Sequence, residues 1–125
     1  MLRLLTLVAV GGALGSVGRY LAQLAVARQF AHPFPLGTLL VNVLGGLLIG
    51  LFYALAERGT MASPEIRLLL TTGFCGGFTT FSTFSYETLI LLEKGQYLLV
   101  ALYVAGSVLL GILATFAGVA LGRLP

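Results

Sequence analysis

The chain contains very little charge. Of its 125 residues only 9% are Asp, Glu, Lys or Arg, whereas 58% are hydrophobic, and the mean hydropathy is +1.05. An ordinary soluble domain carries about 25% charged residues, and a chain this apolar could not cover its hydrophobic side chains in water. The composition therefore indicates an integral membrane protein that is embedded in a lipid bilayer.

Three further absences narrow the possible functions. The single cysteine, Cys75, excludes a disulfide within one chain. The net charge of +3 is spread singly along the sequence, so no basic run offers a surface to nucleic acid. His32 is the one histidine and lies in a proline-rich connector, and no nucleophile–base set or metal-ligand cluster accompanies it. We therefore expect neither an enzyme nor a nucleic-acid-binding protein.

Four apolar segments are each long enough to cross a bilayer, because a helix of about 20 residues spans roughly 30 Å of hydrocarbon. Turn residues occupy the connectors between them. Within the second connector, Ser63, Pro64 and Glu65 have the pattern of an N-cap, a proline at the first helical position and an acid in the first turn. We expect one all-α transmembrane domain over residues 1–125, with helices at about 4–27, 36–56, 66–92 and 97–121.

The charges at the two ends of these helices are nearly balanced. If the four segments alternate in direction, Arg28 and Lys94 fall on one side of the membrane and four arginines on the side of the N-terminus. This is a weak positive-inside bias, which an insertion machinery could read in either direction. A chain that inserts both ways can form an antiparallel dimer. The four arginines are Arg3, Arg58, Arg67 and Arg123.

Pairs of glycines four residues apart indicate close helix packing. Small residues at this spacing let helix backbones approach in lipid, where van der Waals contact replaces the hydrophobic effect. Packing among the four helices of one chain is the favoured interpretation for any one pair, and packing between subunits is the alternative. The pairs are Gly11 with Gly15, Gly46 with Gly50, and Gly118 with Gly122.

Arg19 is the one strong charge well inside the first segment. A charge at the centre of a bilayer costs about 2.5–3.5 kcal/mol on insertion scales. Helical side chains lean toward the helix N-terminus, which aims Arg19 toward the membrane interior. Two roles remain open: attraction of anions into a vestibule, or a structural pairing for which Glu87 is a candidate partner.

Polar side chains recur at helical spacing in the second and fourth segments. Thr38, Asn42 and Gly46 share one face of the second helix, where Asn42 serves either as interhelical glue or as part of a polar pathway. A stripe of hydroxyls along one face of the fourth helix suggests a polar track, although single Ser and Thr side chains often bond back to their own helix. The stripe consists of Tyr103, Ser107, Gly111 and Thr115.

The third segment contains GFCGGFTTFSTFS at 73–85. Its glycines weaken a helix by up to about 1 kcal/mol each, and the following threonines are β-branched, so we expect a break near 76–80. Broken backbone at membrane depth must be buried in protein or line a wet cavity, and its free carbonyls suit Na⁺. Beyond the break, Phe81 and Phe84 share a face beside hydroxyls. Core packing is the ordinary role of such a pair; alternatively their electropositive ring edges lie against an anion.

Three motifs in order resemble the Fluc/CrcB family of fluoride channels: GGALGSVGRY at 11–20, GTLLVNVLGG at 37–46 and GFCGGFTTFSTFS at 73–85. The resemblance covers the whole chain. It implies a fluoride-selective channel of the bacterial inner membrane that exports fluoride passively and lowers its toxicity. It also implies four helices with the third broken, assembled as an antiparallel, dual-topology homodimer with a structural Na⁺ at the dimer interface.

The resemblance also assigns residues to the fluoride pathway. The pore asparagine of the family pattern falls on Asn42, and its paired phenylalanines fall on Phe81 and Phe84. Hydroxyls beside these rings, from Thr80 and Ser82, belong to the same pathway. The fourth-helix polar track includes Ser107, with Tyr103 nearby.

Two further sites follow from the resemblance. Backbone carbonyls of Gly76 and Thr79 from both subunits hold the structural Na⁺. The vestibule arginine of the family falls on Arg19, and we place Thr38, on the same helix face as Asn42, beside it.

Two other functions are alternatives to a channel. A small dual-topology, proton-coupled multidrug exporter needs a carboxylate within the membrane, and Glu87, near the end of the third segment, is the one acid available. A membrane scaffold that transports nothing would leave the stripe of hydroxyls and the helix break without a purpose.

Overall fold

A computed structural model describes residues 1–61 and 63–125, and every regular element in this part of the chain is a helix. Three helices are long and apolar enough to cross a membrane: α1 (Leu2–Gln29), α2 (Leu36–Glu57) and α6 (Tyr97–Gly122). The third segment is divided into α3 (Pro64–Leu68), the π-helix η1 (Leu69–Cys75), α4 (Gly76–Phe78) and α5 (Phe81–Glu93). The expected all-α fold with a broken third span fits this arrangement.

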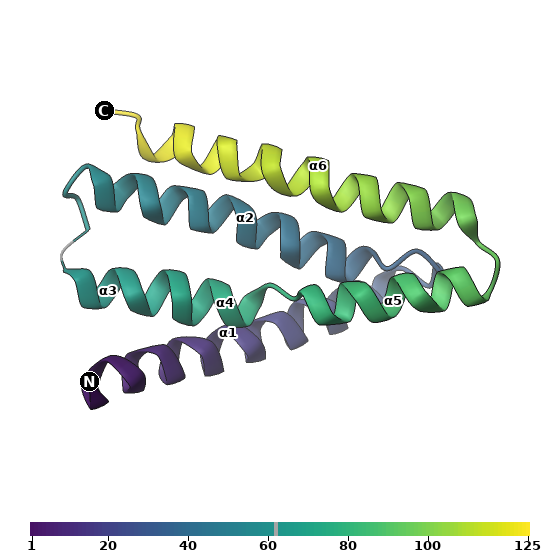
Figure 1. Ribbon diagram of the computed structural model, residues 1–125, viewed down its shortest axis with the longest axis horizontal. Coiled ribbons are helices and arrows are strands. Elements are labelled where there is room, and N and C mark those ends of the chain that lie inside the picture. The colour runs from purple at the N-terminus through teal and green to yellow at the C-terminus, as the bar shows by residue number, and fades with distance from the viewer. Residues whose placement is uncertain (62) are drawn as a thin grey trace.

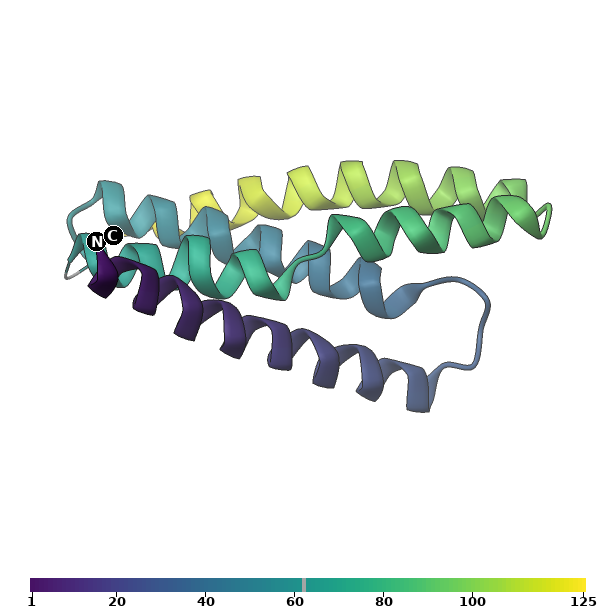
Figure 2. The ribbon, with the colours of Figure 1, turned by 60° about the horizontal axis from the view of Figure 1, so that its bottom comes forward.

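The helices form an elongated bundle with both termini at the same end (Figures 1 and 2). Helices α2 and α6 make the most extensive pair, and α1 lies along η1 and α4. Figure 1 shows α3, η1, α4 and α5 following one another along the bundle, with an extended step between α4 and α5. An even number of crossings explains why both termini lie at the same end.

The start of α3 follows the predicted capping pattern. The Ser63 side chain accepts a hydrogen bond from the backbone N–H of Ile66 at 3.2 Å, Pro64 is in the first turn, and Glu65 adds an acid there. A serine cap satisfies one of the free N–H groups of a helix start, and the acid favours the positive end of the helix dipole. This prediction is confirmed.

The paired glycines pack helices of the same chain. A Cβ on Gly11 or Gly15 would collide with the backbone of η1 and α4 in the third span, and one on Gly50 would collide with the backbone of Thr115 in α6. A Cβ on Gly118 would meet the backbone of Leu47 in α2. Packing within one chain, the favoured interpretation, is therefore confirmed, and α2 and α6 approach closely because each contributes glycines.

The helix break lies at Thr79 and Thr80, just after the glycines. Thr79 (φ −85°, ψ 158°) and Thr80 (φ −150°, ψ 119°) are extended, whereas Gly76 and Gly77 remain helical. The glycines were expected to weaken the helix, but Gly77 instead faces the backbone of Gly12 in α1, too close for any side chain. The break within 76–80 is confirmed, while Gly73 and Gly77 before it serve packing against α1.

Candidate functional site

Asn42 holds the broken ends of the third span together. Its Oδ1 accepts a hydrogen bond from the backbone N–H of Thr80 at 2.8 Å, and its Nδ2 donates to the carbonyl of the same residue at 3.0 Å. One side chain thus satisfies both backbone groups of a residue that has left the helix. Of the two roles left open for Asn42, interhelical bonding is present. An amide nitrogen carries two hydrogens, so one N–H of Asn42 remains available for a ligand.

Arg19 reaches the break from the other side. Its Nε donates to the carbonyl of Gly77 at 3.1 Å, which replaces the helical partner that this carbonyl loses at the break. The pairing with Glu87 was wrong, because the Glu87 carboxylate accepts hydrogen bonds from Thr38 and Tyr103 instead. The acceptor for the guanidinium is a backbone carbonyl at the helix break, and a search of the sequence for acidic partners could not identify it.

Three carbonyls at the break keep no hydrogen bond among the described residues: those of Gly76, Phe78 and Thr79. In a continuous helix they would accept from the N–H groups of Thr80, Ser82 and Thr83. The N–H of Thr80 goes to Asn42 and that of Thr83 goes to the Thr80 hydroxyl. Free carbonyl oxygens of this kind are ligands suited to a hard cation such as Na⁺.

A cavity of about 260 Å³ lies beside the break. It brings together most of the residues assigned to the fluoride pathway, and Ser107 supplies a buried hydroxyl that has no hydrogen-bond partner among the described residues. A buried polar group without a partner is uncommon and calls for a ligand, a water or an ion. The lining residues are Asn42, Thr79, Thr80, Phe81, Phe84, Ser107 and Val108.

The hydroxyls of Thr80 and Ser82 lie close to other hydroxyls at the start of α5. Thr80 Oγ1 accepts from the N–H of Thr83 at 3.2 Å as the N-cap of α5, and it donates to Thr83 Oγ1 at 3.1 Å. Ser82 does not line the cavity, and its hydroxyl lies 3.4 Å from that of Thr80. Ser107 is therefore the pathway hydroxyl whose proton is not already committed.

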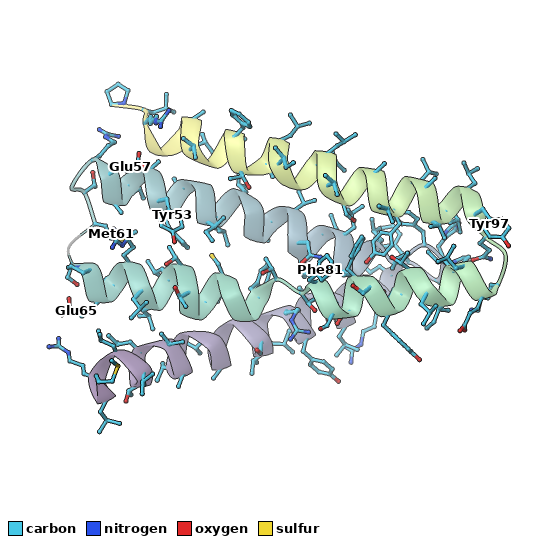
Figure 3. The ribbon with its side chains drawn as sticks, viewed as in Figure 1. Tyr53, Glu57, Met61, Glu65, Phe81 and Tyr97 are labelled. Atoms are coloured by element: carbon cyan, nitrogen blue, oxygen red, sulfur yellow. The ribbon has the colours of Figure 1, made fainter. Side chains whose placement is uncertain are left out.

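The two assigned phenylalanines have different surroundings. Phe81 follows the break directly and is 79% exposed, and it stands at the start of α5 in Figure 3. Phe84 packs at a centroid distance of 4.9 Å on Tyr103, which is fully buried. The two rings lie 5.7 Å apart with their planes inclined by 43°, so they form one aromatic wall of the cavity.

A second polar cluster connects this wall to one end of the bundle. Thr38 Oγ1 donates to Glu87 Oε1 at 2.5 Å and accepts from Gln23 Nε2 at 3.0 Å, while the Tyr103 hydroxyl donates to Glu87 at 3.4 Å. Three of these residues, Gln23, Thr38 and Glu87, line a wider cavity of about 400 Å³ that opens among the connectors. Gln23 was missed, because one amide near a helix end produces no periodic pattern.

Comparison with known proteins gives a consistent answer. A family model described as CrcB-like protein, Camphor Resistance (CrcB), matches residues 6–119. The chain belongs to the CrcB family. It is 52% identical over 117 residues to a protein of Bacteroides fragilis, with 91% of each chain covered, and 53% identical over 118 residues to one of Chlorobaculum tepidum, covering 94% and 93%. A protein of Agrobacterium fabrum is 50% identical over 119 residues, with 95% of each covered. All three relatives are named fluoride-specific ion channel FluC.

Proposed function

We propose that this chain forms a fluoride-selective channel in a bacterial cell membrane. The observation that carries the proposal is the 260 Å³ cavity at the helix break, which is lined by Asn42 with one free N–H, by Ser107 with an unpartnered hydroxyl, and by the rings of Phe81 and Phe84. Relatives about 50% identical over more than nine-tenths of the chain bear the name of that channel. The protein is a transporter and not an enzyme.

The chemistry of the cavity suits a small, strongly hydrated anion. Such an ion must recover hydrogen bonds when it leaves water, and here an amide N–H and a hydroxyl offer donors. The electropositive edges of Phe81 and Phe84 complete the surroundings without a full positive charge that would trap the ion. Neutral hydrogen fluoride enters a cell and ionises there. A negative-inside potential then drives the anion outward at about 2.3 kcal/mol per charge per 100 mV.

The functional unit in this proposal is an antiparallel homodimer. Phe81 is 79% exposed although it lines the cavity at the helix break. A second copy would cover this ring and complete the wall. The nearly balanced charges at the two ends of the helices support insertion in both orientations.

A structural Na⁺ at the dimer centre belongs to the same proposal. The carbonyls of Gly76 and Thr79 have no hydrogen bond among the described residues, and both residues line one cavity with Asn42. Carbonyls from two copies would supply four oxygens. The ion's part is electrostatic: it would neutralise carbonyl dipoles that the break turns toward one another.

The multidrug exporter is not supported. It requires a membrane carboxylate that is available for protons and cationic substrates, whereas Glu87 accepts hydrogen bonds from Thr38 and Tyr103 and sits in a wall shared with aromatic rings. None of the relatives compared carries the name of an exporter.

Fluoride efflux from liposomes tests the proposal. Purified protein is reconstituted into vesicles loaded with potassium fluoride, and efflux is started with valinomycin and followed with a fluoride electrode. We expect rapid efflux from wild-type vesicles and strongly reduced efflux with Phe81→Ile, which keeps an apolar side chain but removes the ring edge. Efflux no faster than from empty liposomes, from protein that is folded and dimeric, would refute the channel.

A further inference from the structure

We infer that Tyr53 and Thr72 form a second anion-binding site on the far side of Asn42 from the phenylalanine pair. A separate cavity of about 500 Å³ starts at Asn42 and extends along α2, η1 and α6 toward the end of the bundle that holds both termini. Tyr53 and Thr72 both line it, and Figure 3 shows Tyr53 on the side of α2 that faces the third span. This inference rests on the proposed function, since it places a further station on the same ion's route.

The cavity contains many hydroxyls, but most have already committed their proton. Thr71 donates to the carbonyl of Arg67 at 2.8 Å, Thr79 to that of Cys75 at 2.9 Å, and Thr115 to that of Gly111 at 3.0 Å. Each of these bonds satisfies the hydroxyl within its own helix, as is common for threonine. A hydroxyl whose hydrogen is used in this way accepts hydrogen bonds but does not donate one to an anion.

Tyr53 and Thr72 differ from these threonines. Within the part of the chain that the structure describes, neither hydroxyl makes a hydrogen bond, although both residues line the cavity. They are the hydroxyls around this cavity whose protons remain available, and Asn42 lines both this cavity and the one beside the phenylalanine pair. An anion that leaves Asn42 in this direction therefore finds its next hydrogen bonds at Tyr53 and Thr72.

The surroundings favour an anion over an apolar guest at these two hydroxyls. Among the described residues no acidic side chain lines the cavity, so no carboxylate would repel an anion there. Gly45, Gly46, Gly76 and Gly111 leave the walls without side chains, which keeps the space open beside the polar groups. The size of the cavity fits an anion that retains part of its water shell while it exchanges donors.

A simpler role for Tyr53 is that of an interfacial aromatic residue. It lies one helical turn before Glu57 at the end of α2, and tyrosines commonly lie at the level of lipid headgroups. That role predicts a change in thermal stability when the hydroxyl is removed and no change in ion flux. The two roles therefore differ in a measurable way.

The test is fluoride flux through reconstituted Tyr53→Phe and Thr72→Val, each of which removes a hydroxyl with little change in shape. We expect each variant to lower the flux by about two- to tenfold, as loss of one hydrogen-bond donor would. Thr72→Ser, which keeps the donor, should restore wild-type flux. The matched controls are Thr71→Val, whose hydroxyl lines the same cavity but bonds Arg67, and Tyr97→Phe at the opposite end of the bundle (Figure 3).

Failure of this inference is distinguishable from failure of the proposed function. If wild-type protein conducts fluoride while Tyr53→Phe and Thr72→Val conduct equally well, the second site is refuted and the channel stands. Equal losses in Thr71→Val and Thr72→Val would also refute it, because the effect would then follow from packing. If wild-type protein conducts no fluoride, the proposed function itself is refuted.

Discussion

In the first half of the third span, residues 64–78, Gly73 and Gly77 lie against the backbone of α1, whereas in the second half, residues 81–93, the rings of Phe81 and Phe84 line a cavity. The first half is therefore defined by steric fit, since added atoms have no room. At the cavity beside the second half, ion binding depends on which side chains still have an N–H or O–H group free to donate a hydrogen bond. Thr79 and Thr80 separate the two, Arg19 bonds the carbonyl of Gly77, and Asn42 bonds both backbone groups of Thr80.

The largest expected effect comes from adding one methyl group to the sterically defined half. A Cβ on Gly77 would collide with the backbone of Gly12, so Gly77→Ala should destabilise the protein by about 1–3 kcal/mol and reduce the yield of folded material. Gly106→Ala in α6, where no atom lies within 4 Å of the new Cβ, is the matched control and should unfold at the wild-type temperature or higher. Thermal unfolding in detergent measures both. Equal unfolding temperatures for the two variants would show that α1 can move away from Gly77 and that the two helices are not tightly packed there.

A large effect on flux with little effect on assembly is expected at the junction of the two halves. Asn42→Asp replaces the N–H groups of the amide with an anionic oxygen, which repels an anion and leaves the Thr80 carbonyl without its donor. We expect fluoride flux to fall by about tenfold or more, the equivalent of 1.4 kcal/mol or more. Flux in liposomes and size-exclusion chromatography are measured on the same sample. Wild-type flux in a dimeric variant would contradict a role for Asn42 in the pathway.

The break separates what could be predicted from the sequence and what could not. Four spans, the Ser63 cap and a break within 76–80 follow from local chemistry, because hydropathy, capping and β-branching act over a few residues. The packing role of Gly73 and Gly77 was missed for a physical reason. Loss of helix propensity and room for a neighbouring backbone have the same cause, the missing Cβ, and only the position of α1 distinguishes them.

Hydrogen-bond partners that are distant in the sequence also could not be predicted. Glu87 was a candidate partner for Arg19, but Arg19 bonds the carbonyl of Gly77, which becomes free only because the chain breaks two residues later. The π-helical turn at Leu69–Cys75 has no sequence signature, and it carries the contact with α1. The residues that meet at the cavity were identified mainly by family resemblance, because their convergence depends on three different helices.

A moderate effect is expected when Na⁺ is withdrawn from the junction. In the proposed dimer, the free carbonyls of Gly76 and Thr79 from two copies would repel one another, and a cation would relieve this repulsion. Purification and reconstitution with N-methylglucamine in place of Na⁺ should lower both fluoride flux and thermal stability, and returning Na⁺ should restore them. Flux that is indifferent to Na⁺ at every step would contradict the structural cation.

The smallest effect sharpens the comparison within α6, where two hydroxyls stand eight residues apart on one face. The Ser107 hydroxyl is buried, has no hydrogen-bond partner in the described part of the chain and is available to an anion, whereas the Thr115 hydroxyl donates to the carbonyl of Gly111 at 3.0 Å. Ser107→Ala should lower fluoride flux by about two- to tenfold, the loss expected for one hydrogen bond, while Thr115→Val should conduct as wild type does. Both are measured by efflux from liposomes at equal protein density. Equal loss of flux in the two variants would show that conduction depends on the polarity of the helix face. It would contradict the claim that only a hydroxyl with a free proton contributes.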